Sequence, residues 1–233
     1  MLFYTPHIEG GFARLDEEES RHLLTVLRRQ PGDRLRLTDG RGHFYEAELA
    51  EVGKKQALAR ILTQETPVPE RMGRLHLAVA PTKQMERYEW MLEKTTELGV
   101  DEITPLICKR SERDTVRLDR LEKILVSAMK QSLRATLPLL HPPTPFQQLV
   151  KNATASQRRI AWCAPDALPH LKSSLRSDQD ALVLIGPEGD FTPEEVALAL
   201  QCGFTGVSLG SARLRTETAG VLAAAVWEVI SGE

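Results

Sequence analysis

Gly210-Ser211-Ala212-Arg213-Leu214-Arg215-Thr216-Glu217-Thr218-Ala219 is hard to explain as ordinary core or turn. It follows a short apolar segment, residues 207–209, and leads into an alanine-rich stretch that predicts a helix ending near Ile230. A connection between a strand and a helix needs little more than a turn former and a cap. Two arginines, an acid and two threonines exceed that need, so this segment predicts a functional loop.

A second unusual loop lies upstream. Ile185-Gly186-Pro187-Glu188-Gly189-Asp190 follows the apolar run 181–184, which reads as a buried strand. In open α/β sheets, ligands bind at the carboxyl ends of the parallel strands. Both loops would lie at that edge, and we expect them to form one binding site.

The pattern along the chain predicts two domains, at residues 1–70 and 71–233. The first reads as a small β-barrel with a helix over 17–28, and the Asp39-Gly40-Arg41-Gly42 turn predicts a hairpin. The polar, proline-bearing link 64–70 precedes the boundary near Arg71. The expected barrel strands are residues 34–37, 43–52 and 57–62.

The second domain alternates strands with helices, which is typical of a mainly parallel α/β sheet. Thr82, Asp119 and Thr192 are expected to cap its helices, the last through a capping box with Pro193 at the first helical position. The expected strands are 75–80, 103–108, 160–164, 181–185 and 207–209.

Composition narrows the class of protein. The 233 residues are 42% hydrophobic and 27% charged, with no apolar run of membrane-spanning length and no secretory signal at the start. The three cysteines are widely separated, so the sequence predicts neither a disulfide framework nor a metal site. We expect a cytoplasmic protein.

Positive charge is unevenly distributed although the formal net charge is −2. Six arginines lie between residues 20 and 41, and eight basic residues lie between 109 and 134. Solvated helix faces would explain either cluster alone. Affinity for phosphate depends on clustered charge. The two clusters together therefore favour a nucleic-acid-binding surface and solvated helix faces equally.

The chemistry of the two loops disfavours a cofactor held by its phosphates. The chain has neither a GxGxxG fingerprint after its first strand nor a GxxxxGK[ST] motif. Gly186, Gly189 and Gly210 instead allow close approach to the main chain, and Leu209 and Leu214 could enclose a base. S-adenosylmethionine, an adenosine compound without phosphate, fits such a site.

Several segments together resemble the SPOUT methyltransferases, and the whole chain resembles the family that methylates N3 of a uridine in 16S ribosomal RNA (RsmE). Besides the two loops, the resemblance rests on residues 22–28 with Gly32-Asp33, 93–100, 103–105, 110–111 and 131–134 with Pro138. The match spans nearly the full length, and the joint occurrence of these segments is highly specific.

The resemblance implies a PUA-like barrel that binds RNA, followed by a SPOUT-type sheet whose C-terminal part forms a trefoil knot around S-adenosylmethionine. It also implies a homodimer that acts on small-subunit ribosomal RNA, either free or in the assembled subunit. It implies no association with a membrane. Trp227, beside Val226 and Ile230, is expected at the dimer contact.

Residue roles follow from the same resemblance. The expected cofactor-binding residues are Ile185, Gly186, Pro187, Glu188, Gly189, Leu209, Gly210, Ser211, Leu214, Arg215, Thr216 and Thr218. The expected RNA-binding residues are Arg21, His22, Arg28, Arg29 and Arg34. The catalytic candidates are Arg110, Arg134 and Glu217.

Alternatives remain open for several of these residues. Arg110 and Arg134 could stabilise a uridine anion or contact RNA phosphate. Glu217 could accept a proton, or pair with Arg215 in a structural role, which we favour. Glu188 could hold its loop by accepting backbone N–H bonds or simply face solvent.

Two positions depart from the commonest family pattern. Asp190 stands where a glycine is frequent, and Lys130 stands where an acid is common. A noncatalytic RNA-binding or ribosome-assembly factor on the same scaffold is the alternative function. A nucleotide-dependent oxidoreductase is disfavoured by the missing glycine fingerprint.

Overall fold

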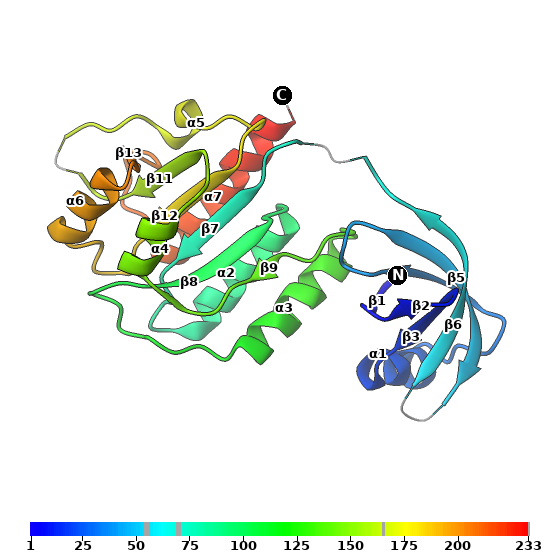
Figure 1. The fold of residues 1–233 in the computed structure, drawn as a ribbon. Coiled ribbons are helices and arrows are strands. Elements are labelled where there is room, and N and C mark those ends of the chain that lie inside the picture. Colours follow the sequence, from blue (N-terminus) through cyan, green and yellow to red (C-terminus); the bar gives the residue numbers. More distant parts are fainter. Residues whose placement is uncertain (54–55, 69–70, 165, 233) are drawn as a thin grey trace. The chain divides into compact units, whose positions relative to one another are not determined.

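The computed structural model describes residues 1–53, 56–68, 71–164 and 166–232 (Figure 1). Its contacts divide the chain into two compact units. The first holds Met1–Val68 together with Val126–Leu137, and the second holds the remaining described residues. Pro69 and Glu70 of the expected link lie outside the described residues, and the boundary near Arg71 stays a prediction.

A curled six-stranded sheet forms the first unit, with the order β1-β4-β5-β6-β3-β2 (Figure 1). Only the β1–β4 pair is parallel among its described pairs. The strands are β1 Leu2–Tyr4, β2 Ile8–Glu9, β3 Phe12–Leu15, β4 Arg34–Thr38, β5 Phe44–Val52 and β6 Ala57–Glu65.

The helix expected over 17–28 is present but irregular. Helix α1, Glu17–Arg21, begins at the cap Asp16 and continues as a π-helix, His22–Val26. Leu23 is fully buried in the core of the first unit, as its spacing predicted. The segment ends where Arg28 adopts a left-handed φ of 53°.

A parallel sheet forms the second unit, with the order β10-β8-β7-β12-β11-β13 and with β9 beside β8. Every described pair in it is parallel, as the alternation of strands and helices predicted. The strands are β7 Leu75–Val79, β8 Glu102–Ile107, β9 Leu139–Leu140, β10 Thr144–Pro145, β11 Gln157–Ala161, β12 Ala181–Ile185 and β13 Thr205–Val207.

Helices cover both faces of this sheet (Figure 1). On one face, α4 and α6 pack through Phe146, Val150 and Val196 onto strand residues such as Leu184. On the other face, α2 packs against α7, which also contacts β7 and β12. The helices are α2 Met85–Glu97, α3 Leu118–Gln131, α4 Phe146–Asn152, α5 Leu171–Ser174, α6 Pro193–Gln201 and α7 Thr216–Ser231.

Some expected boundaries are confirmed and others are wrong. Strand β12 and the capping box of α6 at Thr192 occur as predicted. Helix α2, however, is capped by Gln84, because the Thr82 hydroxyl bonds the Gln84 carbonyl instead. The strands expected at 160–164 and 207–209 end at Ala161 and Val207, and the residues beyond belong to loops.

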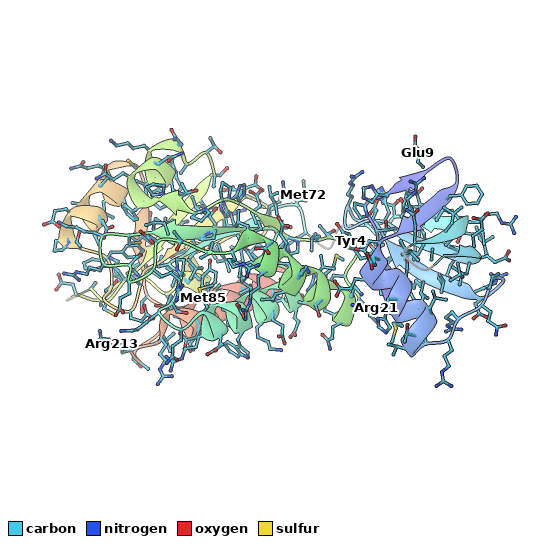
Figure 2. All side chains as sticks on the ribbon, turned by 90° about the horizontal axis from the view of Figure 1, so that it is seen from below. Tyr4, Glu9, Arg21, Met72, Met85 and Arg213 are labelled. Carbon is cyan, nitrogen blue, oxygen red and sulfur yellow. The ribbon has the colours of Figure 1, made fainter. Side chains whose placement is uncertain are left out.

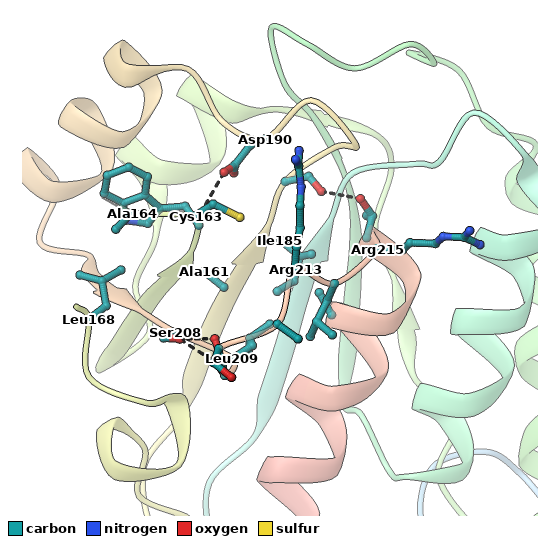
Figure 3. A pocket seen from close by; sticks show the side chains of 18 of the residues that line it. Ala161, Cys163, Ala164, Leu168, Ile185, Asp190, Ser208, Leu209, Arg213 and Arg215 are labelled. Atoms are coloured by element: carbon teal, nitrogen blue, oxygen red, sulfur yellow. Dashed lines mark hydrogen bonds between the residues drawn. The ribbon is translucent and has the colours of Figure 1, made fainter. Parts of the chain in front are cut away.

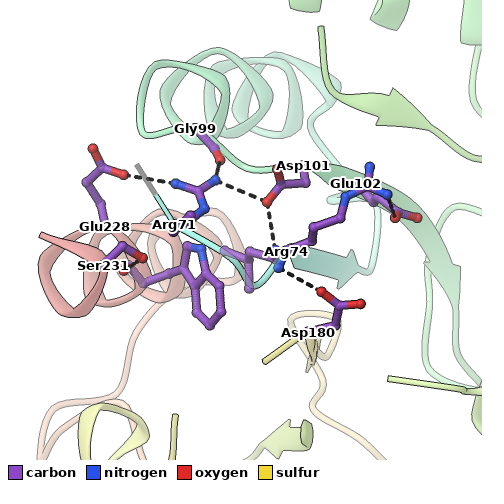
Figure 4. Close-up of polar contacts among 10 residues, drawn as sticks. Arg71, Arg74, Gly99, Asp101, Glu102, Asp180, Glu228 and Ser231 are labelled. Carbon is purple, nitrogen blue, oxygen red and sulfur yellow. Dashed lines mark hydrogen bonds and ion pairs between the residues drawn. The ribbon is translucent and has the colours of Figure 1, made fainter. Parts of the chain in front are cut away.

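Arg71 ties the start of the second unit to its core (Figure 4). Its guanidinium donates to the Gly99 carbonyl and lies 3.0 Å from Asp101 and 3.4 Å from Glu228. The same group lies 6.0 Å from the ring centre of Trp227, which is fully buried within this chain. The expectation that Trp227 forms a dimer contact is therefore wrong.

Candidate functional site

Three loops enclose a cavity of about 910 Å³ in the second unit (Figure 3). They follow β11, β12 and β13, which are neighbours in the sheet, at the carboxyl ends of the strands. Because β12 and β13 lie on opposite sides of β11, the chain reverses its direction of winding here, where open sheets bind ligands. The described lining comprises residues 161–164, 166–168, 185–188, 190, 208–216 and 219.

The two loops that the sequence singled out meet directly. Thr216 begins α7, and its buried hydroxyl donates to the carbonyl oxygen of Gly186 at 3.0 Å. This bond joins the loop after β13 to the loop after β12. The prediction that the two loops lie together is confirmed, and their role as one binding site stays a prediction.

Asp190 joins the third loop to the other two. Its carboxylate accepts the Cys163 N–H at 3.0 Å (Figure 3). It also accepts the Phe191 N–H at 2.8 Å. Its φ of 62° lies in the left-handed region, which aspartate tolerates better than most residues. Asp190 thus anchors the loop after β11 to the loop after β12.

The loop after β13 presents its main chain to the cavity. Gly210 has a φ of +129°, and its N–H donates to the Ser208 hydroxyl at 3.1 Å. A side chain at this position would meet open space. Among the described residues, no hydrogen bond uses the N–H groups of residues 211–214. Within the described residues, these N–H groups therefore keep their donors unused beside the cavity.

Neighbouring loops support the loop after β12 from outside the cavity. Glu188 accepts the Lys83 N–H at 3.0 Å, so its expected loop-holding role is confirmed. The Arg110 guanidinium donates to the Gly189 carbonyl at 2.7 Å. A Cβ at Gly189 would lie 3.4 Å from the Arg110 side chain, which is an ordinary van der Waals contact.

Tight packing explains why a glycine stands at position 186. A Cβ at this position would lie 3.2 Å from the ring of Phe191, a core residue that is 4% exposed. The loop after β12 therefore sits tightly on the core, while the loop after β13 keeps open space at Gly210.

Charged side chains differ in their surroundings. Glu217 is 7% exposed, and its carboxylate lies 3.9 Å from Arg87 on α2. No ion pair joins it to Arg215 in the part of the chain that the structure describes, so the expected pairing of those two residues is wrong. Arg213 and Arg215 are both exposed and line the cavity.

The thiol of Cys163 lies beside this site. Its pKa is raised, first by burial and then by the negative charge of Asp190, and Arg213 opposes the rise. Figure 3 shows the Arg213 side chain extending toward Asp190, while that of Arg215 is directed away from it. The thiol therefore stays protonated at neutral pH and is a poor nucleophile.

The structure brings most of the predicted cofactor-binding residues together. Gly189 and Thr218 are outside the described lining, because Gly189 packs on Arg110 and Thr218 is exposed on α7. The residues that do line the cavity are Ile185, Gly186, Pro187, Glu188, Leu209, Gly210, Ser211, Leu214, Arg215 and Thr216.

Two of the catalytic candidates, Arg110 and Glu217, have different partners in the second unit. Arg110 supports the loop after β12, and Glu217 is buried against Arg87. Arg134 belongs to the first unit, so its relation to the cavity stays a prediction.

Sequence reasoning missed the loop after β11. Trp162 and Leu168 line the cavity, and Trp162 also packs against the core of the second unit. Part of the signal was present: β11 ends in the apolar residues Ile160 and Ala161 and belongs to the same parallel sheet, so its carboxyl end must reach the same edge. Because the strand was expected to end at residue 164 and in fact ends at 161, residues 162–164 of the loop were assigned to the strand.

The first unit carries the expected RNA-binding side chains on its surface. Figure 2 shows Arg21 at the end of α1. His22 is half-buried, with its ring 6.2 Å from that of Phe3, so it contributes to packing as well. The exposed members of the set are Arg21, Arg28, Arg29 and Arg34.

Comparison with family models divides the chain in a similar way. Residues 69–228 match the model of an RNA methyltransferase domain. Residues 15–62 match the model of an RNA methyltransferase PUA domain. Both models name RNA methyltransferases, and together they reach from the first unit to the last helix.

Individual proteins match over nearly the whole chain. Ribosomal RNA small subunit methyltransferase E of Rickettsia conorii is 32% identical, covering 88% of this chain and 84% of the relative. A crystal structure of a "probable rRNA-methyltransferase" from Porphyromonas gingivalis superposes with a TM-score of 0.91 at 44% identity, covering 99% and 98%. Ribosomal RNA small subunit methyltransferase E from Neisseria gonorrhoeae, bound to S-adenosyl methionine, superposes with a TM-score of 0.87 at 30% identity, covering 98% and 97%.

Proposed function

The chain belongs to the ribosomal RNA small subunit methyltransferase E family, and from that premise we propose that it methylates N3 of a uridine in 16S ribosomal RNA with S-adenosylmethionine as methyl donor. The observation that carries this proposal is the three-loop cavity at the carboxyl ends of β11, β12 and β13. A related protein with similar coordinates is bound to the same methyl donor.

The cavity fits this donor. Its volume, about 910 Å³, lies in the range of small-molecule sites. Leu209, Leu214 and Ile185 would enclose the adenine, and the unbonded N–H groups of 211–214 would read its edge. Open space at Gly210 lets a ligand reach the main chain. The bound donor supplies an electrophilic methyl group on a sulfonium.

The protein must then orient the uridine and manage one proton. A new N–C bond forms at N3, the S–C bond breaks, and the imide proton leaves for solvent water. A nearby cation favours the ionised imide and so lowers its pKa. Arg213 and Arg215 line the cavity, and we assign this role to them.

The other charged candidates take supporting roles in this proposal. Arg110 positions the loop after β12 through the Gly189 carbonyl. Glu217 lies in the first turn of α7 and is paired with Arg87, so it orders the helix and does not accept the proton. Arg134 contacts RNA.

The first unit supplies RNA affinity through the exposed guanidinium groups of Arg21, Arg28, Arg29 and Arg34, which bind phosphate, and through the half-buried imidazole of His22. If four of these contact phosphate, binding should weaken steeply as salt rises. The described part of the chain contains no helix long and apolar enough to cross a membrane. We place the protein in the cytoplasm, where its ribosomal substrate lies.

We further propose a homodimer with a knotted second unit. Two large apolar side chains support the dimer: Trp90 on α2 is 45% exposed and Val229 on α7 is 55% exposed, on helices that pack together. Light scattering on the purified protein should give twice the monomer mass. A monomer at micromolar concentration would contradict the dimer while leaving the activity proposal intact.

Two measurements test the activity. Calorimetry should detect S-adenosylmethionine binding, and mass spectrometry should detect 3-methyluridine after incubation with 16S RNA that lacks the modification. RNA binding without methyl transfer, by folded protein, would favour the noncatalytic assembly factor.

Gly210→Trp tests where the donor binds, because the indole would fill the open space at this position. Gly210→Ala is the matched control, since it carries the same strain at φ +129° with little added volume. We expect the tryptophan variant to lose donor binding and the alanine variant to keep most of it.

A further inference from the structure

A second cluster of reactive side chains lies away from the cavity. His76, Glu102 and His141 each offer one potential ligand atom, and these atoms all lie within 4.8 Å of one another. All three side chains are partly buried. Neither the proposed methyl transfer nor RNA binding uses them.

The sheet itself brings the three residues together. His76 on β7 is the register partner of Glu102 on β8, and Glu102 is in turn the partner of Leu139 on β9. His141 lies two residues after Leu139 and continues the pairing through its N–H, which bonds the Ile103 carbonyl. Register partners and residues two apart share a face, so the three side chains project from one side of the sheet.

Neighbouring groups hold these side chains in place. Nε2 of His141 lies 2.8 Å from Oε2 of Glu102, and Arg74 lies 3.5 Å from Oε1 of the same carboxylate. The Thr104 hydroxyl lies 2.7 Å from Nε2 of His76. Outer partners such as Arg74 and Thr104 fix the orientation of ligands in protein metal sites.

Space for further ligands adjoins the cluster. A cavity of about 390 Å³ is lined by His76 and Glu102 together with polar groups that include Thr144 and Gln148. Water molecules there could complete a coordination sphere around three protein ligands. The cluster sits at the amino ends of β7 and β8, opposite the edge that holds the three-loop cavity.

We propose that His76, Glu102 and His141 bind a divalent first-row transition-metal ion of the Zn²⁺ class. Two imidazoles with one carboxylate suit Zn²⁺, Co²⁺ or Ni²⁺, whereas Mg²⁺ and Ca²⁺ prefer oxygen ligands alone. The bound ion clamps β7, β8 and the segment after β9. This differs from the sequence-based expectation, which weighed cysteine spacing and predicted no metal site.

The experiment uses full-length protein treated with EDTA and then dialysed. Calorimetric titration with Zn²⁺ should show one ion per chain, and Co²⁺ should produce a visible absorption band from nitrogen and oxygen ligation. His141→Ala and Glu102→Gln should each weaken Zn²⁺ binding at least tenfold. Glu102→Gln keeps the shape of the side chain. It therefore tests the site even if His141→Ala does not fold.

Controls separate this site from other ligands on the surface. His7→Ala removes an exposed histidine of the first unit, and Cys163→Ser removes an exposed thiol; neither should change Zn²⁺ affinity. The proposal is overturned if Zn²⁺ shows no saturable binding up to millimolar concentration. It is also overturned if folded Glu102→Gln binds Zn²⁺ as tightly as the unchanged protein.

Discussion

The hydroxyl of Thr216 donates to the carbonyl oxygen of Gly186 at 3.0 Å, across a sequence separation of 30 residues. This buried bond fixes the start of α7 against the loop after β12. It makes one cavity out of two loops that the sequence could only describe separately.

Thr216→Val should weaken S-adenosylmethionine binding about tenfold, since the Gly186 carbonyl loses its partner and about 1–3 kcal/mol is at stake. Thr218→Val is the control, because Thr218 is exposed on the same helix outside the cavity lining. Calorimetry of both variants decides the matter. Equal dissociation constants for the two would contradict the role assigned to Thr216, and weakening by Thr218→Val would restore that residue to the binding set.

Asp190→Gly should loosen the loop after β11, because the Cys163 N–H loses its acceptor while glycine still tolerates φ 62°. Amide hydrogen exchange at Cys163 should accelerate about tenfold, the equivalent of one lost hydrogen bond. Asp190→Asn retains a side-chain carbonyl acceptor, so its exchange rate at Cys163 should lie between those of the unchanged protein and the glycine variant. Unchanged exchange in the glycine variant would show that Asp190 does not anchor this loop.

Glu217→Gln should leave methyl transfer within severalfold of the unchanged protein while lowering the free energy of unfolding by about 1 kcal/mol. The carboxylate faces Arg87 and stands in the first turn of α7, so its charge serves the helix. Steady-state kinetics and urea unfolding measure the two effects. A thousandfold loss of kcat with normal stability would instead identify Glu217 as the proton acceptor.

Burial raises the pKa of Glu19, and its contact with Lys130 opposes that rise without cancelling it. Because the pKa is higher in the folded state, the protonated carboxyl contributes to stability, and this contribution is fully present below the ordinary pKa of 4.5. That contribution is lost as the pH rises through the folded-state value. Relative to Glu19→Gln, the unchanged protein should therefore lose stability as the pH rises above 4.5. Parallel pH profiles in urea unfolding would contradict the raised pKa.

Gly73→Ala should destabilise the second unit by about 1–3 kcal/mol, because an added Cβ would lie 2.5 Å from the Gln179 carbonyl oxygen. The clash is with main chain, which has no rotamer to give way. Gly232→Ala is the control, since its nearest atom is at 3.8 Å. Thermal unfolding should separate the variants by several degrees, and equal midpoints would show that the backbone near Gln179 yields.

Local pattern was most informative where one short segment determines its own structure. The capping box at Thr192 and strand β12 form as expected, since cap chemistry and apolar runs act over a few residues. Thr82 was misassigned as a cap, because its hydroxyl has a competing local acceptor in the Gln84 carbonyl.

Long-range pairing explains most of what was missed. The Glu217 partner proved to be Arg87, which is 130 residues earlier in the chain, and not the adjacent Arg215. Likewise, His76, Glu102 and His141 form no motif in the sequence, and only the register of β7, β8 and β9 assembles them.

The sequence by itself determined the alternation of strands and helices, the two loops at one edge of the sheet and the family, because each is written in contiguous residues. Only the tertiary structure decided that the loop after β11 completes the cavity and that Asp190 and Thr216 hold the three loops together. The physical reason is that a parallel sheet places distant loops side by side through its strand order, and strand order is set by packing across the whole unit.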